Sequence, residues 1–197
     1  MSVREEILAR VRANQPAPAP LPVVPVFAAP ADAQPPLQAF QAALERMGGR
    51  WAEAPAEGDL GAWLATLFPQ AKVVVSATGE VAGTRPLDFA QPPAALEDVD
   101  VGVVRALFGV AETGSVLLDE IQFGVPALGF LSQHLVVLLD PQRIVADMHA
   151  AYLEPALARA RYAVFMTGPS ATADIEGVLI RGAQGIRSLT VVPLSLR

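Results

Sequence analysis

The chain has 197 residues, a length that suits one domain with an appendage and that can bury a core without a metal or a disulfide. It contains no cysteine, which excludes disulfides, iron–sulfur ligation and thiol nucleophiles. The net charge is −6 and the basic residues are scattered, so the sequence lacks the electrostatic footprint of a nucleic-acid-binding protein. Glu5 and Glu6 lie where a signal peptide would be apolar, and no apolar run reaches about 18 residues. We expect a soluble, cytoplasmic protein that contacts neither nucleic acid nor membrane.

The N-terminal part, residues 1–36, is expected to be an appendage to a domain spanning residues 37–197. Residues 3–14 predict a short helix, because apolar side chains recur there at helical spacing. Residues 15–36 hold eight of the chain's 18 prolines, which is typical of a linker or of an extended arm. A helix of this length is marginal alone, so we expect it to dock on its own domain or on a second subunit, which makes a homo-oligomer conceivable.

Two helices are predicted next. Residues 37–49 read LQAFQAALERMGG, with apolar residues on one face and Gly48-Gly49 as the stop signal. Residues 59–69 read DLGAWLATLFP, in which Asp59 is the expected N-cap and Pro69 follows the end. The apolar run KVVVS at 72–76 predicts a strand.

Strands dominate the second half of the predicted domain. We expect strands near 101–105 and 115–118, with a turn around Gly109 between them. The continuous apolar run HLVVLLD (134–140) is typical of a strand buried on both faces, and YAVFM (162–166) and LTVVPL (189–194) predict two further buried strands.

A helix is expected after the run 134–140. Asp140-Pro141 supplies an N-cap and a first helical residue, and Pro155 should end or kink that helix. This alternation predicts the α/β class, as a three-layer α/β/α arrangement with a mostly parallel sheet and helices on both faces.

The stretch TGPSATADIEG, Thr167 to Gly177, follows an expected strand and should open a helix. Ligands of open α/β sheets bind at the carboxyl ends of strands, where free N–H groups of a helix can face a phosphate or a carboxylate. The same stretch is also what a well-capped helix requires, since acidic residues stabilise its first turn. Both interpretations stay open. The candidate binding residues are Gly168, Pro169, Ser170, Thr172, Asp174 and Glu176.

A second candidate is the stretch AETGSVLLDE, residues 111–120. Glu112 is a possible base or nucleophile at the end of an apolar segment, and Thr113, Gly114 and Ser115 are possible binding residues beside it. The alternative is a structural turn acid that accepts backbone N–H groups around Gly114.

The remaining polar residues indicate no metal site and no cofactor. His134 and His149 have no ligand-spaced partner, so a structural role is favoured for each. The G-x-x-G of RGAQGIR, residues 181–187, is too short a pattern to indicate a phosphate loop by itself.

The motifs ETGS, TGPSATADIEG and GAQG, in this order, resemble the LUD-domain family of lactate utilisation, in particular its short members of the protein C group. The resemblance covers roughly residues 37–196 and is densest from Gly109 onward. It departs from the family where Gly182-Ala183-Gln184-Gly185-Ile186 replaces a common G-V-H-G-P, so no role of that histidine carries over.

The resemblance implies a fold similar to the sugar-phosphate isomerase and CoA-transferase group. It also implies a part in oxidising L-lactate to pyruvate beside partner subunits that carry iron–sulfur clusters. Glu112-Thr113-Gly114 looks like the Glu-Asn-Gly turn that holds the CoA-transferase nucleophile, an analogy at the level of fold. Two hypotheses follow. The chain is a non-redox component of a lactate-oxidising system, acting on partners or on a small organic acid, or it is an enzyme or sensor that binds CoA or a phosphorylated metabolite.

Overall fold

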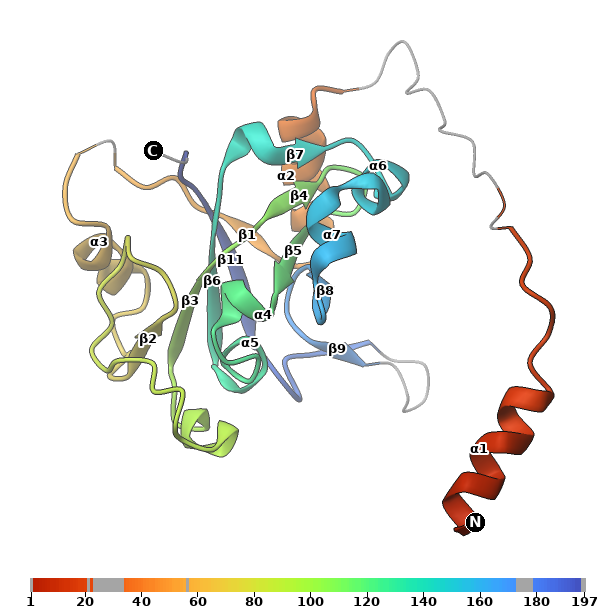
Figure 1. The fold of residues 1–197 in the computed structure, drawn as a ribbon. Helices are drawn as coiled ribbons and strands as arrows, with labels where there is room; N and C mark the ends of the chain where they lie inside the picture. The colour runs from red at the N-terminus through yellow and green to blue at the C-terminus, as the bar shows by residue number, and fades with distance from the viewer. Residues whose placement is uncertain (1, 21, 23–33, 56, 173–178, 196–197) are drawn as a thin grey trace.

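A computed structural model describes residues 2–20, 22, 34–55, 57–172 and 179–195 (Figure 1). The α-helices are α1 (Val3–Ala13), α2 (Pro36–Arg46), α3 (Leu60–Leu67), α4 (Glu120–Phe123), α5 (Leu128–Leu131), α6 (Met148–Leu153) and α7 (Pro155–Arg159). Two 3₁₀ turns are η1 (Pro93–Leu96) and η2 (Pro141–Arg143). The strands are β1 (Arg50–Trp51), β2 (Val74–Ser76), β3 (Val101–Arg105), β4 (Phe108–Val110), β5 (Ser115–Asp119), β6 (His134–Leu139), β7 (Ile144–Val145), β8 (Ala163–Met166), β9 (Ala171–Thr172), β10 (Ile180–Arg181) and β11 (Ser188–Pro193).

The centre of the fold is a parallel sheet with the strand order β1-β11-β6-β3-β2. Every pairing between these strands is parallel. The central strand β6 places His134 opposite Ser188 of β11 on one side and opposite Val101 of β3 on the other. After His134, every residue of β6 is buried. A continuous apolar run therefore becomes a strand covered on both faces.

One face of the parallel sheet is covered by α3 (Figure 1). Leu64 of α3 packs with Val103 of β3 and with Val136 and Leu138 of β6. The helix begins at the expected place, because the Asp59 carboxylate accepts hydrogen bonds from the Gly61 and Ala62 amides at 2.6 and 3.1 Å. Such a cap satisfies two amides that have no partner within the helix.

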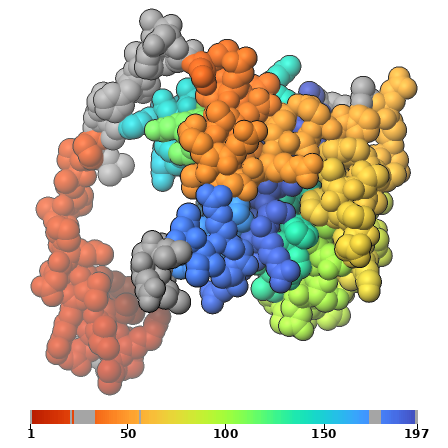
Figure 2. Space-filling view, turned by 180° about the vertical axis from the view of Figure 1, so that it is seen from behind, coloured from red at the N-terminus to blue at the C-terminus, as the bar shows by residue number. Residues whose placement is uncertain are grey.

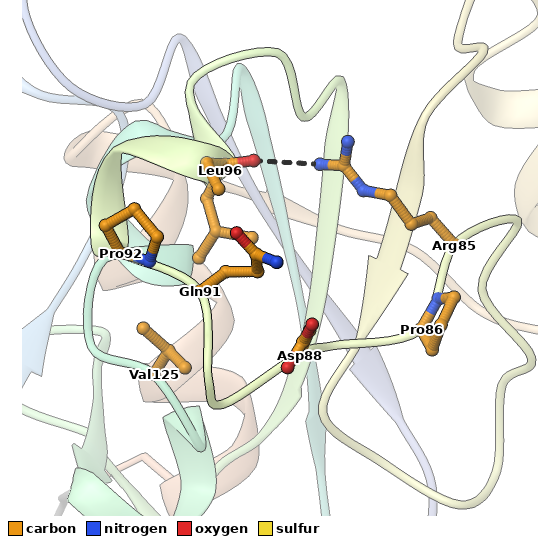
Figure 3. A pocket seen from close by; sticks show the side chains of 8 residues that line it. Arg85, Pro86, Asp88, Gln91, Pro92, Leu96 and Val125 are labelled. Carbon is orange, nitrogen blue, oxygen red and sulfur yellow. Dashed lines mark hydrogen bonds between the residues drawn. The ribbon is translucent and has the colours of Figure 1, made fainter.

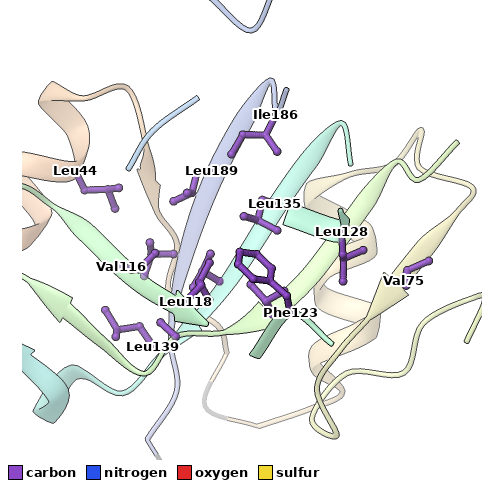
Figure 4. Close-up of a cluster of buried hydrophobic side chains, with 14 of the residues drawn as sticks. Leu44, Val75, Val116, Leu118, Phe123, Leu128, Leu135, Leu139, Ile186 and Leu189 are labelled. Carbon is purple, nitrogen blue, oxygen red and sulfur yellow. The ribbon is translucent and has the colours of Figure 1, made fainter. Parts of the chain in front are cut away.

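The opposite face carries the larger core (Figure 4). Leu135 and Leu139 of β6 alternate with the residues that face α3, so they point to this side, where Leu118 of β5 and Phe123 of α4 meet them. Phe40 and Leu44 of α2 close the same cluster and are fully buried. Burying each such side chain contributes about 1.5–3 kcal/mol, so this layer is a main source of stability.

A second sheet lies on that core, with the order β7-β4-β5-β8. β4 and β5 form an antiparallel hairpin, β8 is antiparallel to β5, and β7 is parallel to β4. β5 is buried throughout because Val116 and Leu118 face the parallel sheet, whereas Leu117 packs in a separate cluster beneath α6 and α7. The mixed sheet is thus an extra layer between the central core and the α6–α7 pair (Figure 1).

The predicted α/β class and the mostly parallel central sheet are confirmed. So are the strands at 101–105, 115–118, 134–140 and 189–194, which appear as β3, β5, β6 and β11. The break at Pro155 is confirmed as well, because α6 ends before it and α7 begins with it.

Three local predictions are wrong. Gly109 lies inside β4, and the turn before β5 spans residues 111–114 instead. The Asp140 carboxylate accepts from the Gln142 amide and caps only the short η2, while the helix that follows begins at Met148 behind its own cap, Asp147. The run 162–166 does form a strand, β8, but it is half-buried and antiparallel in the second sheet.

The N-terminal helix α1 has a capping box in which the Ser2 hydroxyl accepts from the Glu5 amide and the Glu5 carboxylate accepts from the Ser2 amide. None of its residues is buried, and Val3, Ile7 and Val11 are 75%, 56% and 55% exposed. Across the part of the chain that the structure describes, helices are too short and too polar to cross a membrane.

Candidate functional site

The β4–β5 turn holds the first group of predicted site residues. Gly114 has a φ of +64° and donates its amide to the Val110 carbonyl at 2.9 Å. A Cβ on Gly114 would clash with the backbone of Ala43 and Leu44 in α2. Only glycine meets both conditions, since an L side chain is disfavoured at this φ and has no room. The glycine of this motif is therefore required by the packing of α2 on the turn.

Glu112, the predicted base or nucleophile, is exposed and accepts a hydrogen bond from the Met148 amide at 2.9 Å. It thereby adds a second acidic cap to α6, beside Asp147, which accepts from the Ala150 amide at 2.7 Å. This contact gives Glu112 a structural role, as the turn-acid alternative predicted. The donor, however, is an amide 36 residues away and not one around Gly114. Ser115 is buried at the start of β5, 6% exposed.

The two predicted motifs meet in space. The Thr167 hydroxyl lies 3.5 Å from the Thr113 carbonyl, to which it donates. The hydroxyl of Thr113 is itself buried and has no hydrogen-bond partner among the described residues. Gly168 follows with a φ of +60°, and a Cβ there would clash with the Met47 carbonyl just beyond α2. The end of α2 thus holds both glycine turns together.

The predicted helix after Gly168 does not begin at Ser170 or Thr172. The Ser170 amide donates to the Ile186 carbonyl at 3.0 Å, and the Ser170 carbonyl accepts from the Gly182 amide at 2.6 Å. Ala171–Thr172 then forms β9, which pairs antiparallel with β10. A β-branched residue after Ser-Ala fits an extended backbone as well as a helix cap, and the cross-strand partner decides between them. Asp174 and Glu176 lie outside the described residues.

A groove of about 430 Å³ runs beside these turns. We call it the motif groove; its lining includes Met47, Phe130, Thr167–Ala171, Leu179, Arg181, Gly185 and Ile186. Figure 2 shows this C-terminal part of the chain (blue) directly below α2 and the turn that follows it (orange). Of the predicted binding residues, the groove collects Gly168, Pro169 and Ser170, whereas Glu112 does not line it.

The motif groove is mostly apolar, and among the described residues it is lined by one charged side chain, the guanidinium of Arg181. Met47, Phe130 and Leu179 are 49%, 40% and 55% exposed, a high value for large apolar side chains. The Arg181 guanidinium lies over Gly48, close enough that a Cβ there would clash with it. Within the described part of the chain, Arg181 forms no ion pair with a carboxylate. Such a surface fits an apolar partner or a small molecule that ends in an acid.

The comparisons with known proteins agree with this architecture. The family model of the LUD domain matches residues 93–193, which run from η1 to the end of β11. The chain belongs to the LUD-domain family. LUD-domain proteins are associated with lactate utilisation.

A solved structure supports the fold of this LUD domain. It is the crystal structure of a DUF162 family protein from Deinococcus radiodurans, 17% identical to this chain, with a TM-score of 0.61. The match covers 80% of this chain and 95% of that chain. At this identity the likeness concerns the fold alone. No curated protein matches the chain.

The chain has another hollow, of about 330 Å³, around the loop 85–98 (Figure 3). Its cation is already paired: the Arg85 guanidinium holds both oxygens of Asp98 at 2.7 and 2.9 Å and donates to the Ala95 carbonyl at 3.3 Å. The hydrogen bonds from Arg85 lower the pKa of the exposed Asp98 carboxyl. Pro86 and Pro92 lie in the remaining wall beside the polar side chains of Asp88 and Gln91. The Arg85–Asp98 pair joins the two ends of this loop, so the charge of the arginine is already balanced within the chain.

Sequence reasoning missed a third hollow, which lies at the amino ends of the parallel strands and which we call the amino-edge pocket. His134, expected to be structural, hydrogen-bonds through Nδ1 to the Ser188 hydroxyl at 2.8 Å. These residues are 54 positions apart, and only the register of β6 on β11 brings them together. The described residues hold no group of three metal-binding side chains.

Proposed function

We propose that this LUD-domain protein is a non-redox component of an L-lactate-oxidising system and works with iron–sulfur partner subunits. The observation that carries the proposal is the LUD match over residues 93–193, which includes the Gly114 turn and the Gly168 turn beside the motif groove. Oxidising lactate to pyruvate releases two electrons and two protons. Iron–sulfur clusters that accept such electrons are held by cysteine thiolates, and this chain has no cysteine. In this proposal the iron–sulfur clusters are therefore held by other chains.

The motif groove is the proposed contact face for those partners. Its rim combines exposed Met47, Phe130 and Leu179, and exposed apolar side chains gathered in one place are typical of interaction surfaces. Arg181 adds a cation that can pair with a carboxylate of the partner or of a small organic acid. Partners would gain the binding energy of the apolar rim, and the arginine would fix their orientation.

The experiment is to purify the tagged, full-length chain from its native cells grown on L-lactate. We expect the purified material to contain iron and acid-labile sulfide, and to reduce an artificial electron acceptor when L-lactate is added. Phe130→Asp should remove both the iron and the lactate-dependent reduction, because it places a charge in the apolar groove. Leu153→Asp is the matched control, since Leu153 is 68% exposed on α6, away from the groove.

Two results would contradict the proposal. One is wild-type material that carries neither iron nor lactate-dependent reduction. The other is a deletion strain that grows on L-lactate as well as its parent. Iron retained by the Phe130→Asp variant would show instead that the contact face lies elsewhere, and loss of iron in both variants would mean that the surface charge acts without regard to its place.

The alternative function, binding of CoA or a phosphorylated metabolite, keeps one supporting observation, the motif groove with Arg181. Its anion site at a helix N-terminus is absent from Ser170 to Thr172, where the chain is extended. A thermal-shift screen of the purified chain separates the two functions. A ligand at a hundred times its dissociation constant stabilises by about 2.7 kcal/mol, or roughly 5–11 °C for this size. A shift with CoA, acyl-CoA or a sugar phosphate that Arg181→Gln removes would favour the alternative.

A further inference from the structure

The N-terminal helix α1 presents an apolar stripe to its surroundings. Val3, Ile7 and Val11 follow one another at intervals of four residues, and each is more than half exposed. Residues three and four positions apart are neighbours on the surface of a helix. The side chains around Ile7 are therefore Val3 and Val11 along the stripe, with Arg4 and Arg10 on its two sides. Neither glutamate of the helix belongs to this set, so the apolar face is bordered by positive charge.

The face is formed before any partner arrives. The capping box at Ser2 fixes the start of the helix, which holds the stripe in register. The Arg10 guanidinium pairs with Glu6 at 2.6 Å, but these side chains are 76% and 56% exposed. An exposed pair of this kind contributes little, so Arg10 is available to a carboxylate on another surface.

A second exposed apolar surface surrounds the hollow at the loop 85–98 (Figure 3). Phe89 and Ile121 are 72% and 74% exposed. The Phe89 ring lies against Gly124, where a Cβ would come within 3.0 Å of it, and the Gly124 amide donates to the Ile121 carbonyl at 3.2 Å. The loop and α4 thus form one surface. We call it the loop–α4 face; its apolar residues are Pro86, Leu87, Phe89, Pro92, Ile121 and Val125.

The loop–α4 face is acidic. Residues 85–98 and 120–125 contain one arginine, Arg85, which is already paired with Asp98. Hydrogen bonds from the backbone, the largest from the Arg161 amide, lower the pKa of Glu120, so this carboxyl is ionised at neutral pH. The formal charge of the two segments is −3, since their carboxylates are Asp88, Glu97, Asp98 and Glu120.

Charge distinguishes this surface from the motif groove as a site for α1. At the motif groove, Arg4 and Arg10 would approach the guanidinium of Arg181. At the loop–α4 face they approach carboxylates, of which Asp88 lines the hollow itself. Like charges in a contact are unfavourable and opposite charges set its orientation, so the loop–α4 face is the better match.

The two surfaces belong to one chain but do not cover each other in it. Residues 14–35, between the two helices, could span up to about 70 Å when extended, so length does not keep α1 from its own domain. Nevertheless, α1 has no buried residue, and Phe89 and Ile121 stay exposed. Each copy therefore offers both an unpartnered helix and an unpartnered face of complementary charge.

We propose that two copies of this chain exchange their N-terminal helices, so that each α1 docks its stripe on the loop–α4 face of the other copy. The exchange is two-fold symmetric, and both contacts form together. Burial of the apolar side chains drives the contact, and the arginines fix its orientation. The hollow at the loop–α4 face shares no lining residue with the motif groove among the described residues. The exchange therefore leaves the proposed contact face for iron–sulfur partners open.

The first test is light scattering of the full-length chain during size-exclusion chromatography, over a range of protein concentrations. We expect a mass twice the 20.7 kDa of one chain, falling toward one chain on dilution. Ile7→Asp should raise the dissociation constant about tenfold or more, because it places a charge in the centre of the apolar stripe. Ala9→Asp is the matched control, since it adds the same charge on the opposite, exposed side of α1.

The second test addresses the receiving surface. Phe89→Lys should also remove the dimer, because it replaces an apolar contact with a charge that repels the arginines. Leu153→Lys, at a position 68% exposed on α6, is its control. A mixture of Ile7→Asp and Phe89→Lys chains should regain a dimer weaker than that of the wild type, since one intact helix then meets one intact face. Circular dichroism shows that each variant is folded.

Several outcomes would overturn the proposal. One is a chain that is monomeric at every concentration, which includes a chain whose α1 docks on its own domain. Others are a dimer that persists in both Ile7→Asp and Phe89→Lys, or one that Ala9→Asp disrupts equally. A dimer that Phe130→Asp disrupts and Phe89→Lys does not would place α1 in the motif groove. Dimer mass and iron content are separate measurements, so this proposal and the function proposed above fail separately.

Discussion

The motif groove and the amino-edge pocket are built from different kinds of residues. Beside the groove, Gly114 and Gly168 are required because the end of α2 touches their backbone, and Glu112 caps a helix. At the amino ends of the parallel strands, His134 and Arg187 line one hollow that no short sequence motif predicts. In this fold, a specific motif marks close backbone packing, whereas strand register brings together the polar side chains of His134 and Ser188.

The largest expected effect is a loss of stability when the close packing of Gly114 against α2 is disturbed. Gly114→Ala adds a Cβ at a φ of +64° that would clash with the α2 backbone. We expect a loss of about 3 kcal/mol or more in the free energy of unfolding, since both the conformation and the contact disfavour the methyl group. Urea denaturation followed by circular dichroism measures it.

Gly79→Ala is the control for that substitution. Gly79 has open space around its Cα and no positive φ, so the change should stay within about 0.5 kcal/mol. If Gly114→Ala were as harmless as Gly79→Ala, the ETGS motif would not be explained by packing and a ligand role for the turn would regain support.

The second effect concerns the buried hydrogen bonds at the amino edge. Asp100→Ala leaves the Lys72 and Val73 amides without their acceptor and should destabilise the chain by about 1–3 kcal/mol. Urea denaturation measures this loss as well. A loss no larger than that of Gly79→Ala would mean that water replaces the carboxylate at these two amides.

A smaller effect separates the two interpretations of Glu112. Glu112→Ala removes a cap of α6, so it should lower the free energy of unfolding by about 0.5–2 kcal/mol. The binding of lactate and pyruvate should stay unchanged. Chemical denaturation and calorimetric titration on the same samples give both values. Glu57→Ala, at an exposed loop position, is the neutral control. Loss of binding or of an activity at unchanged stability would instead support the catalytic interpretation.

Much of the parallel sheet is predictable from local sequence. The apolar runs that become β6 and β11 are continuous, and the aspartate before α3 is an unambiguous cap. These features depend on residues close in the chain, so composition and spacing suffice to place them.

The mixed sheet and the amino-edge pocket were not predictable in the same way. β7 is two residues long, and β8 has no alternation that distinguishes an antiparallel partner from a parallel one. Ser170 followed by Ala-Thr suits a helix start and a strand equally, and pairing with β10 decides the outcome. The contact of His134 with Ser188 depends on the register between two strands, which no single-sequence pattern contains.

The smallest expected effect is a pH dependence of the free energy of unfolding, which arises from the titration of His134. Burial and Arg187 lower the pKa of His134 in the folded chain, and Asp100 opposes them. The unfolded chain therefore binds a proton at this histidine first as the pH falls through about 6.5, its ordinary value, so stability is present above that pH and decreases below it. Between pH 7.5 and 5.5 we expect the wild type to lose up to about 1 kcal/mol more than His134→Gln, a modest size because the ring is only partly buried. The difference between the two proteins reports the imidazole together with its electrostatic interaction with Asp100. Equal losses would mean that the imidazole is as well hydrated when folded as when unfolded, and that the pocket is wetter than its lining of Phe68 and Ser188 indicates.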